Sequence, residues 1–254
     1  MEKKHNRINT KKNAFDVDKT VKSTNPKSKP SRTKPNDKAV QMAKSKDTGN
    51  NSQETRKPKS GQSIRNNKAR KILVVVDVQN DFITGVLGNK DCQTAAKRIV
   101  EKLTTEADKY DAFYFTRDVH FDNYLETLEG QKLPVAHCID GTEGCDFVNG
   151  IQDAIKYLRK NGKYIKVITK HTFGSNTLAD ILNATCRATD EIELCGVCTD
   201  ICVVSNALSL RQAMPNRVIK VNPSYCAGTS RAAHKAALRT MNSCQIDIIA
   251  GGNY

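Results

Sequence analysis

Short apolar runs alternate with helical stretches from residue 72 onward, and this alternation restricts the fold more than any other feature of the sequence. Each run is short and rich in β-branched or aromatic residues, which is typical of a buried strand. The runs cover residues 72–76, 112–116, 164–169, 191–195, 217–221 and 246–249. Helical stretches are expected near residues 93–108, 147–160, 177–186, 201–213 and 230–242. Strands that alternate with helices require right-handed crossovers, so we predict an α/β domain whose mostly parallel sheet is covered on both faces.

The net positive charge of the chain lies in the segment before the first apolar run. Residues 1–70 contain 20 of the 41 Lys and Arg but only 6 of the 27 Asp and Glu, so the formal charge of +14 lies there. This segment has hardly any aromatic residues and cannot bury enough apolar surface to offset the entropy of ordering it. We therefore predict a disordered basic tail at residues 1–66 and one domain at residues 67–254. The favoured interpretation is a solvated tail, or a true start codon downstream of Met1; a basic arm that contacts nucleic acid is the less favoured alternative.

The cysteines indicate a reducing compartment. All nine lie after residue 90, and the odd number favours free thiols over a disulfide framework. No stretch resembles a secretion signal or an apolar membrane span. We expect a cytoplasmic protein without a membrane span.

Reactive residues directly follow four of the apolar runs. Asp77 follows the first run, Asp118 and His120 the second, Lys170 the third, and the fourth leads to Cys202. Ligands of open parallel sheets bind outside the carboxyl ends of the strands. We therefore expect these side chains to converge at one edge of the sheet.

Cys202 is the candidate nucleophile. It lies where a strand and loop give way to a predicted helix, and helix-terminal N–H groups there favour a thiolate. Asp77 could take the thiol proton and Lys170 could stabilise the resulting charges. The backbone N–H groups of Cys198 and Cys202 could bind the oxyanion that forms when an amide carbon becomes tetrahedral.

A second group of residues has metal-ligand chemistry. Asp118, His120 and His137 form a set that suits zinc, iron or manganese, and Glu129 between the histidines is a candidate further ligand. By contrast, Cys195 and Cys198 have no second pair at matching spacing, so we do not expect them to bind metal.

Five motifs in order resemble the isochorismatase-like cysteine hydrolases, and within them the nicotinamidase branch. They are "VVDVQNDF", "TRDVH", "HCIDGT", "TKHTFGS" and "GVCTDICV", and they extend over about residues 72–250. The resemblance implies a three-layer α/β fold with a six-stranded parallel sheet and a catalytic triad of Asp77, Lys170 and Cys202. It also implies a cis peptide bond between Val197 and Cys198 beside the oxyanion hole.

The resemblance further implies one divalent metal ion, with zinc favoured, a small-molecule amide substrate and a homo-oligomer. Nicotinamide is the leading substrate. The alternatives are a related hydrolase for an N-carbamoyl, ureido or isochorismate-type substrate and, more remotely, a non-catalytic binding protein that uses the basic tail.

The chain departs from the family pattern at the substrate pocket. It contains no tryptophan, although many nicotinamidases have one beside the substrate ring. We expect Phe82, Tyr124 and Leu133 to line the pocket instead.

Overall fold

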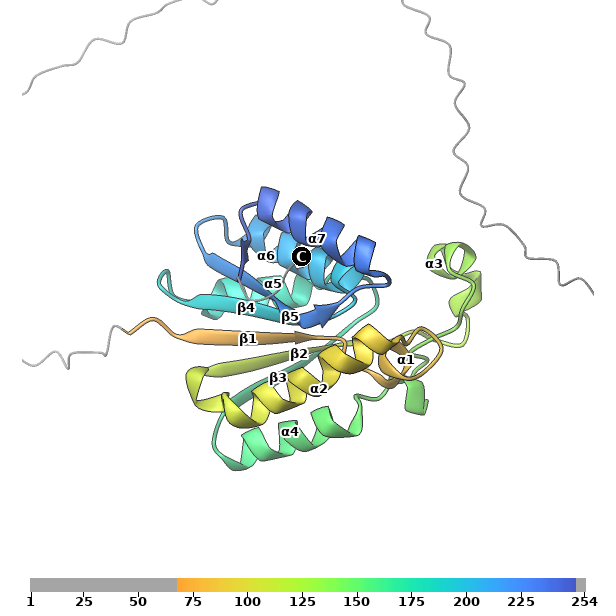
Figure 1. Ribbon diagram of the computed structural model, residues 1–254, viewed down its shortest axis with the longest axis horizontal. Helices are drawn as coiled ribbons and strands as arrows, with labels where there is room; N and C mark the ends of the chain where they lie inside the picture. The colour runs from red at the N-terminus through yellow and green to blue at the C-terminus, as the bar shows by residue number, and fades with distance from the viewer. Residues whose placement is uncertain (1–67, 250–254) are drawn as a thin grey trace, which may run out of the picture. The chain divides into compact units, whose positions relative to one another are not determined.

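A six-stranded parallel sheet forms the centre of the protein, in a computed structural model that describes residues 68–249 (Figure 1). The strands lie in the order β3-β2-β1-β4-β5-β6, and each adjacent pair is parallel. They are β1 Lys71–Val76, β2 Ala112–Asp118, β3 Tyr164–Lys170, β4 Glu191–Val197, β5 Val218–Ala227 and β6 Asp247–Ile248. The predicted six-stranded parallel sheet is confirmed, while the predicted tail at residues 1–66 lies outside the described residues.

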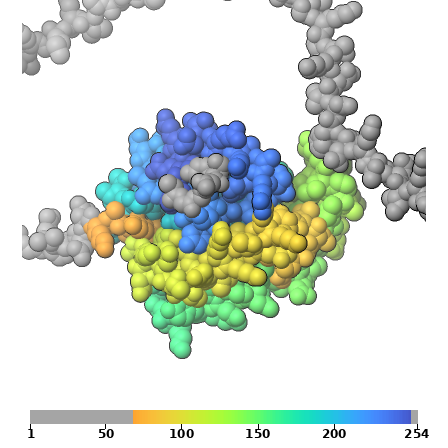
Figure 2. Space-filling model, viewed as in Figure 1, coloured from red at the N-terminus to blue at the C-terminus, as the bar shows by residue number. Residues whose placement is uncertain are grey.

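Helices cover both faces of this sheet and complete the three predicted layers. The α-helices are α1 Asn80–Ile83, α2 Lys90–Thr105, α3 Leu128–Lys132, α4 Asn149–Lys160, α5 Asn176–Thr185, α6 Val204–Ala213 and α7 Arg231–Ser243. Short helical turns are η1 Ala107–Lys109, η2 Tyr124–Glu126, η3 Glu143–Cys145 and η4 Thr199–Val203. Helices α2 and α4 lie on one face and α5, α6 and α7 on the other (Figure 1). In the space-filling view, the yellow band of α2 separates the blue C-terminal helices from green α4 (Figure 2).

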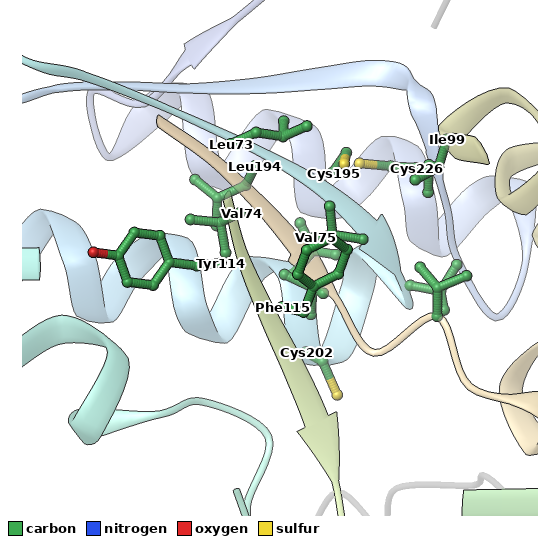
Figure 3. Close-up of a cluster of buried hydrophobic side chains, with 14 of the residues drawn as sticks. Leu73, Val74, Val75, Ile99, Tyr114, Phe115, Leu194, Cys195, Cys202 and Cys226 are labelled. Carbon is green, nitrogen blue, oxygen red and sulfur yellow. The ribbon is translucent and has the colours of Figure 1, made fainter. Parts of the chain in front are cut away.

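The central strand explains why the sheet needs both helical layers. Every residue of β1 after Lys71 is buried, because β1 lies between β2 and β4 and has helices over both faces. Its valines pack with Phe115 and Leu194 in the core (Figure 3). Cys202 is drawn at the border of the same cluster, so the candidate nucleophile rests directly on the hydrophobic core.

Several element boundaries differ from the sequence prediction. Strands β2 and β3 continue past their apolar runs, because Arg117 and Asp118 pair with Thr169 and Lys170 in the ladder. The helix expected at 201–213 begins as the wider π-helical turn η4, and α6 starts only at Val204. The short helices α1 and α3 were not predicted, since neither is long enough to show helical periodicity. Within residues 68–249, no helix is long and apolar enough to cross a membrane.

Candidate active site

Three neighbouring strands bring charged side chains to the same edge of the sheet. Asp77 follows β1, Asp118 ends β2, and Lys170 ends the outer strand β3. Asp118 and Lys170 are direct partners in the β2–β3 register. Strand β4 then leads into η4, which carries Cys202. The side chains that the sequence predicted to converge do lie together.

The ammonium group of Lys170 lies at the centre of this cluster. Its Nζ is 2.7 Å from Asp77 Oδ2, 3.1 Å from Asp118 Oδ1 and 3.7 Å from Cys202 Sγ. All four residues are at least 96% buried. Such a charge cluster, removed from water, is stable only because opposite charges and hydrogen bonds compensate its desolvation.

The backbone and a threonine fix the carboxylate of Asp77. Its φ angle is 49°, in the left-handed region, which turns the chain away from β1 immediately after the strand ends. Thr116 Oγ1 donates a hydrogen bond to Asp77 Oδ1 at 2.6 Å, and the backbone N–H of Asp77 donates to Thr116 O. One carboxylate oxygen is thus held by β2, and the other faces Lys170.

Burial and neighbouring charges set the resting protonation of the cluster. Burial raises the pKa of the Cys202 thiol well above its usual range; the Asp77 carboxylate adds to this effect and Lys170 opposes it. Burial also raises the pKa of Asp77, against the attraction of Lys170. For Lys170, burial opposes the charged form, but the neighbouring acidic groups, Asp77 foremost, raise its pKa on balance. The resting site therefore contains a neutral thiol beside a lysine ammonium.

The η4 turn carries Cys202 and begins directly after Cys198. The Val197–Cys198 peptide bond is cis, as the family resemblance implied. The carbonyl of Cys198 accepts hydrogen bonds from the N–H groups of Ile201 and Val203, both at 3.1 Å. These bonds shape the turn that carries Cys202.

Asp118, His120 and His137 form a metal-type cluster next to Lys170. One ligand atom of each lies within 4.8 Å of the others, and all three residues are buried. The Nδ1 of His137 donates to the carbonyl of Val135 at 2.8 Å, which orients the ring and leaves Nε2 as the atom available to a metal. Imidazole and carboxylate donors in this arrangement fit a divalent transition metal.

Glu129 lies at the same cluster. Its Oε1 is 3.7 Å from His120 Nε2 and 3.9 Å from His137 Nε2. This oxygen is buried and accepts no hydrogen bond from any described residue. A buried carboxylate oxygen without a hydrogen-bond donor is costly unless a cation faces it, which is a second observation that fits a metal here.

A cavity of about 320 Å³ opens onto Cys202 and the metal-type residues. Phe82 and Leu133, two of the residues expected around the substrate, line this cavity. Tyr124 does not: its ring packs against His120 and His137 with centroid distances of 4.7 and 4.9 Å, and its hydroxyl donates to the Leu133 carbonyl. Tyr124 therefore packs against the two imidazole rings and is not among the residues that line the cavity. The other lining residues are Val86, Leu87, Gly88, Asn89, Asp118, Glu129, His137, Phe173, Cys198, Ile201, Cys202 and Thr229.

The model of the isochorismatase domain matches residues 71–251 of this sequence. The chain belongs to the isochorismatase family.

Members of this family with curated names resemble most of the described domain. A nicotinamidase/pyrazinamidase of Mycobacterium tuberculosis is 28% identical over 183 residues, which are 70% of this chain and 97% of that protein. A nicotinamidase of Schizosaccharomyces pombe is 25% identical over 207 residues, covering 70% of this chain and 92% of that protein.

Solved structures of the family share the fold. The pyrazinamidase/nicotinamidase of Streptococcus mutans superposes with a TM-score of 0.61 at 28% identity, over 70% of this chain and 99% of that one. The pyrazinamidase of Pyrococcus horikoshii, solved in complex with zinc, has a TM-score of 0.55 at 22% identity and covers 71% and 98%.

Two residues of the first family motif have structural roles that the sequence did not reveal. The amide of Gln79 donates to the Asp118 carbonyl at 2.7 Å and accepts from the Asp118 N–H at 2.7 Å. Asp81 Oδ2 accepts a hydrogen bond from the Cys138 N–H at 2.7 Å, next to His137. Gln79 and Asp81 thus hold two segments that carry metal-type residues, and their residue types alone do not indicate these contacts.

Proposed function

We propose that this protein is a cysteine-dependent amidohydrolase, and that its substrate is nicotinamide, which it converts with water to nicotinic acid and ammonia. The observation that carries the proposal is the position of Lys170 Nζ, in contact with Asp77, Asp118 and Cys202. The names of the two curated relatives support the substrate.

In the proposed cycle, Asp77 takes the proton of the Cys202 thiol while Lys170 stabilises the thiolate. The sulfur attacks the carboxamide carbon, and the backbone N–H groups of Cys198 and Cys202 bind the oxyanion of the tetrahedral intermediate. The C–N bond then breaks, the amide nitrogen takes the proton from Asp77, and ammonia leaves. Water, deprotonated by Asp77, hydrolyses the thioester and returns a proton to the sulfur.

We propose that Asp118, His120 and His137 hold one divalent metal ion, with Glu129 as a further ligand. Zinc is favoured over iron and manganese, because two imidazoles and carboxylates suit it and the P. horikoshii relative was solved with zinc. When bound, the metal supplies a Lewis acid beside the pocket that can hold a ring nitrogen of the substrate. Phe82, Leu133 and Phe173 would enclose the ring.

The domain boundary, location and assembly stay predictions. We propose one catalytic domain at residues 67–254 in the cytoplasm. All nine cysteines lie among the described residues, and none forms a disulfide there, which agrees with a reducing compartment. The homo-oligomer and the role of the basic tail are open to direct measurement.

The test is ammonia release from nicotinamide by the full-length chain loaded with zinc. Cys202→Ala should abolish release, whereas Cys244→Ala, at an exposed cysteine far along the chain, should not change it. A Cys202→Ala protein with full activity would contradict the mechanism. A folded, zinc-loaded wild-type protein that releases no ammonia would exclude nicotinamide and favour an N-carbamoyl, ureido or isochorismate-type substrate.

A further inference from the structure

Asn206 occupies a fully buried position one helical turn after Cys202. Its Nδ2 donates to the Cys202 carbonyl at 2.8 Å and to the Phe173 carbonyl at 3.2 Å. Its Oδ1 accepts from the Ser175 N–H at 3.0 Å. The side-chain amide thus uses both of its donors and its acceptor at a fully buried position.

These bonds join two segments that meet only through the fold. One is the start of α6, immediately after the turn that carries Cys202. The other is the connection between β3 and α5, which begins after Lys170 and contains Phe173 and Ser175. Ser175 also caps α5, because its Oγ accepts from the Leu178 N–H at 3.1 Å. Asn206 therefore links the backbone of Cys202 to the β3–α5 connection, which is itself held in place by the cap that Ser175 forms on α5.

Two functional side chains in or next to this connection lie near the nucleophile. Lys170 Nζ approaches Cys202 Sγ at 3.7 Å, and Phe173 lines the cavity onto which Cys202 opens. The connection also packs closely on α6: a methyl group at Gly174 would lie 3.4 Å from the Ser205 carbonyl. A shift of α6 against the connection would thus alter both the thiol–ammonium distance and the width of the cavity.

We infer that Asn206 is a positioning residue that keeps the Cys202 thiol in register with Lys170 and with the Phe173 wall of the cavity. No described side chain other than Asn206 hydrogen-bonds to both segments at once. A displacement of about 1 Å at a reacting atom can lower a rate about 100-fold, so a small loss of register is expected to be measurable. The kinetic part of this inference rests on the proposed function, whereas thiol reactivity does not.

Two substitutions at Asn206 remove different sets of its hydrogen bonds. Asn206→Asp keeps an acceptor for the Ser175 N–H but loses both donors and places a carboxylate oxygen against two carbonyls. Asn206→Thr is smaller and neutral and is too short to span both segments. Ser209→Ala is the matched control, because Ser209 lies one turn further along α6, bonds only to the Ser205 carbonyl and lies near the same connection, since a methyl group added at Gly174 would be 3.3 Å from its Oγ.

The first readout is the rate at which iodoacetamide alkylates Cys202 as a function of pH, with the modified peptide identified by mass. The second is kcat and KM for the amide, and the third is the melting temperature. We expect both Asn206 variants to shift the pH profile of alkylation and to lower kcat about 10- to 100-fold, with a smaller change in KM. Ser209→Ala should leave all three readouts as in the wild type.

The inference is overturned if folded Asn206 variants lose only thermal stability and keep the wild-type alkylation profile and kcat. It is also overturned if Ser209→Ala lowers kcat as much as the Asn206 variants do. If the wild-type protein releases no ammonia, the proposed substrate fails, but the alkylation profiles still decide the role of Asn206.

Discussion

Lys170 Nζ lies 3.1 Å from Asp118 Oδ1, so the lysine proposed for catalysis contacts a carboxylate proposed to bind metal. The same nitrogen contacts Asp77 at 2.7 Å. One buried ammonium is therefore shared by two anionic centres, and a change at either centre is expected to affect the other.

Replacing Lys170 by methionine should destabilise the protein as well as abolish turnover. Two buried carboxylates would lose their common cation, which costs about 3–5 kcal/mol at neutral pH. Burial already raises the pKa of Asp77, and loss of the ammonium would raise it further. An acid whose pKa is raised by folding destabilises the fold as pH increases, so the loss should shrink from pH 7 toward pH 4. Urea unfolding at several pH values measures this.

The control for that experiment is Lys220→Met. Lys220 pairs with Glu191 at 2.9 Å, but both side chains are about 30% exposed. Its removal should cost less than about 1 kcal/mol at any of these pH values. An equal cost for the two variants would refute the idea that the buried cluster depends on its cation.

Gln79→Leu should weaken metal binding without removing a ligand. The leucine cannot make the paired hydrogen bonds that fix the Asp118 backbone. Loss of such outer partners typically lowers metal affinity about 10- to 100-fold. Competition with a zinc chelator measures the affinity, and Gln152→Leu, which loses one bond to the Phe147 carbonyl, is the control. Unchanged zinc affinity would assign Gln79 a purely structural role.

Glu129→Gln tests whether this carboxylate is a metal ligand. The substitution keeps the shape of the side chain but removes its charge, and we expect at least a 10-fold loss of zinc affinity. Glu126→Gln removes a charge from an exposed position in the same segment and should have little effect. Equal zinc affinities for wild type and Glu129→Gln would leave a three-residue ligand set.

Asp190 should make the stability of the domain dependent on acid pH. Burial opposes its charged form, but hydrogen bonds from Arg70 and from the Arg187 backbone hold the pKa of Asp190 below its usual range. A depressed pKa contributes stability that is present above the unfolded value and is lost as pH falls through the folded value. Asp190→Asn should cost about 1.5–3 kcal/mol at pH 7 and much less near pH 2.

Thermal or urea unfolding of Asp190→Asn gives the comparison, with Asp153→Asn as its control. Asp153 pairs with Lys156, but both side chains are 72% exposed. A pH-independent cost at Asp190 would contradict the role of its charge. Because Arg70 supplies the partner, the same experiment on a chain that starts at residue 71 tests where the domain begins.

The sequence predicted the parts of this site that have chemistry of their own. Asp77, Asp118 and Lys170 directly follow apolar runs, and parallel strands bring such positions to one edge of the sheet. It suggested Tyr124 for the pocket, whereas the Tyr124 ring packs against His120 and His137, and no periodicity marks an element as short as η2.

Residues that act only through the backbone were not predictable in the same way. The amide of Gln79 bonds to Asp118, and that of Asn206 bonds to Phe173 and Ser175 as well as to nearby Cys202, so both reach segments distant in sequence. An amide side chain has no reactivity that would single it out. The groups to which they bond depend on how segments far apart in the sequence pack against each other. Tertiary packing, rather than any local pattern, determines these contacts.

The order of the site residues along the chain also fixes the order in which they emerge during synthesis. Residues 71–170 supply β1, β2 and β3, and with them Asp77, every proposed metal ligand and Lys170. Cys202 and Asn206 are made later, with the second half of the sheet. As the chain leaves the ribosome, the ligands that could capture a metal ion therefore emerge before the thiol that would perform the chemistry.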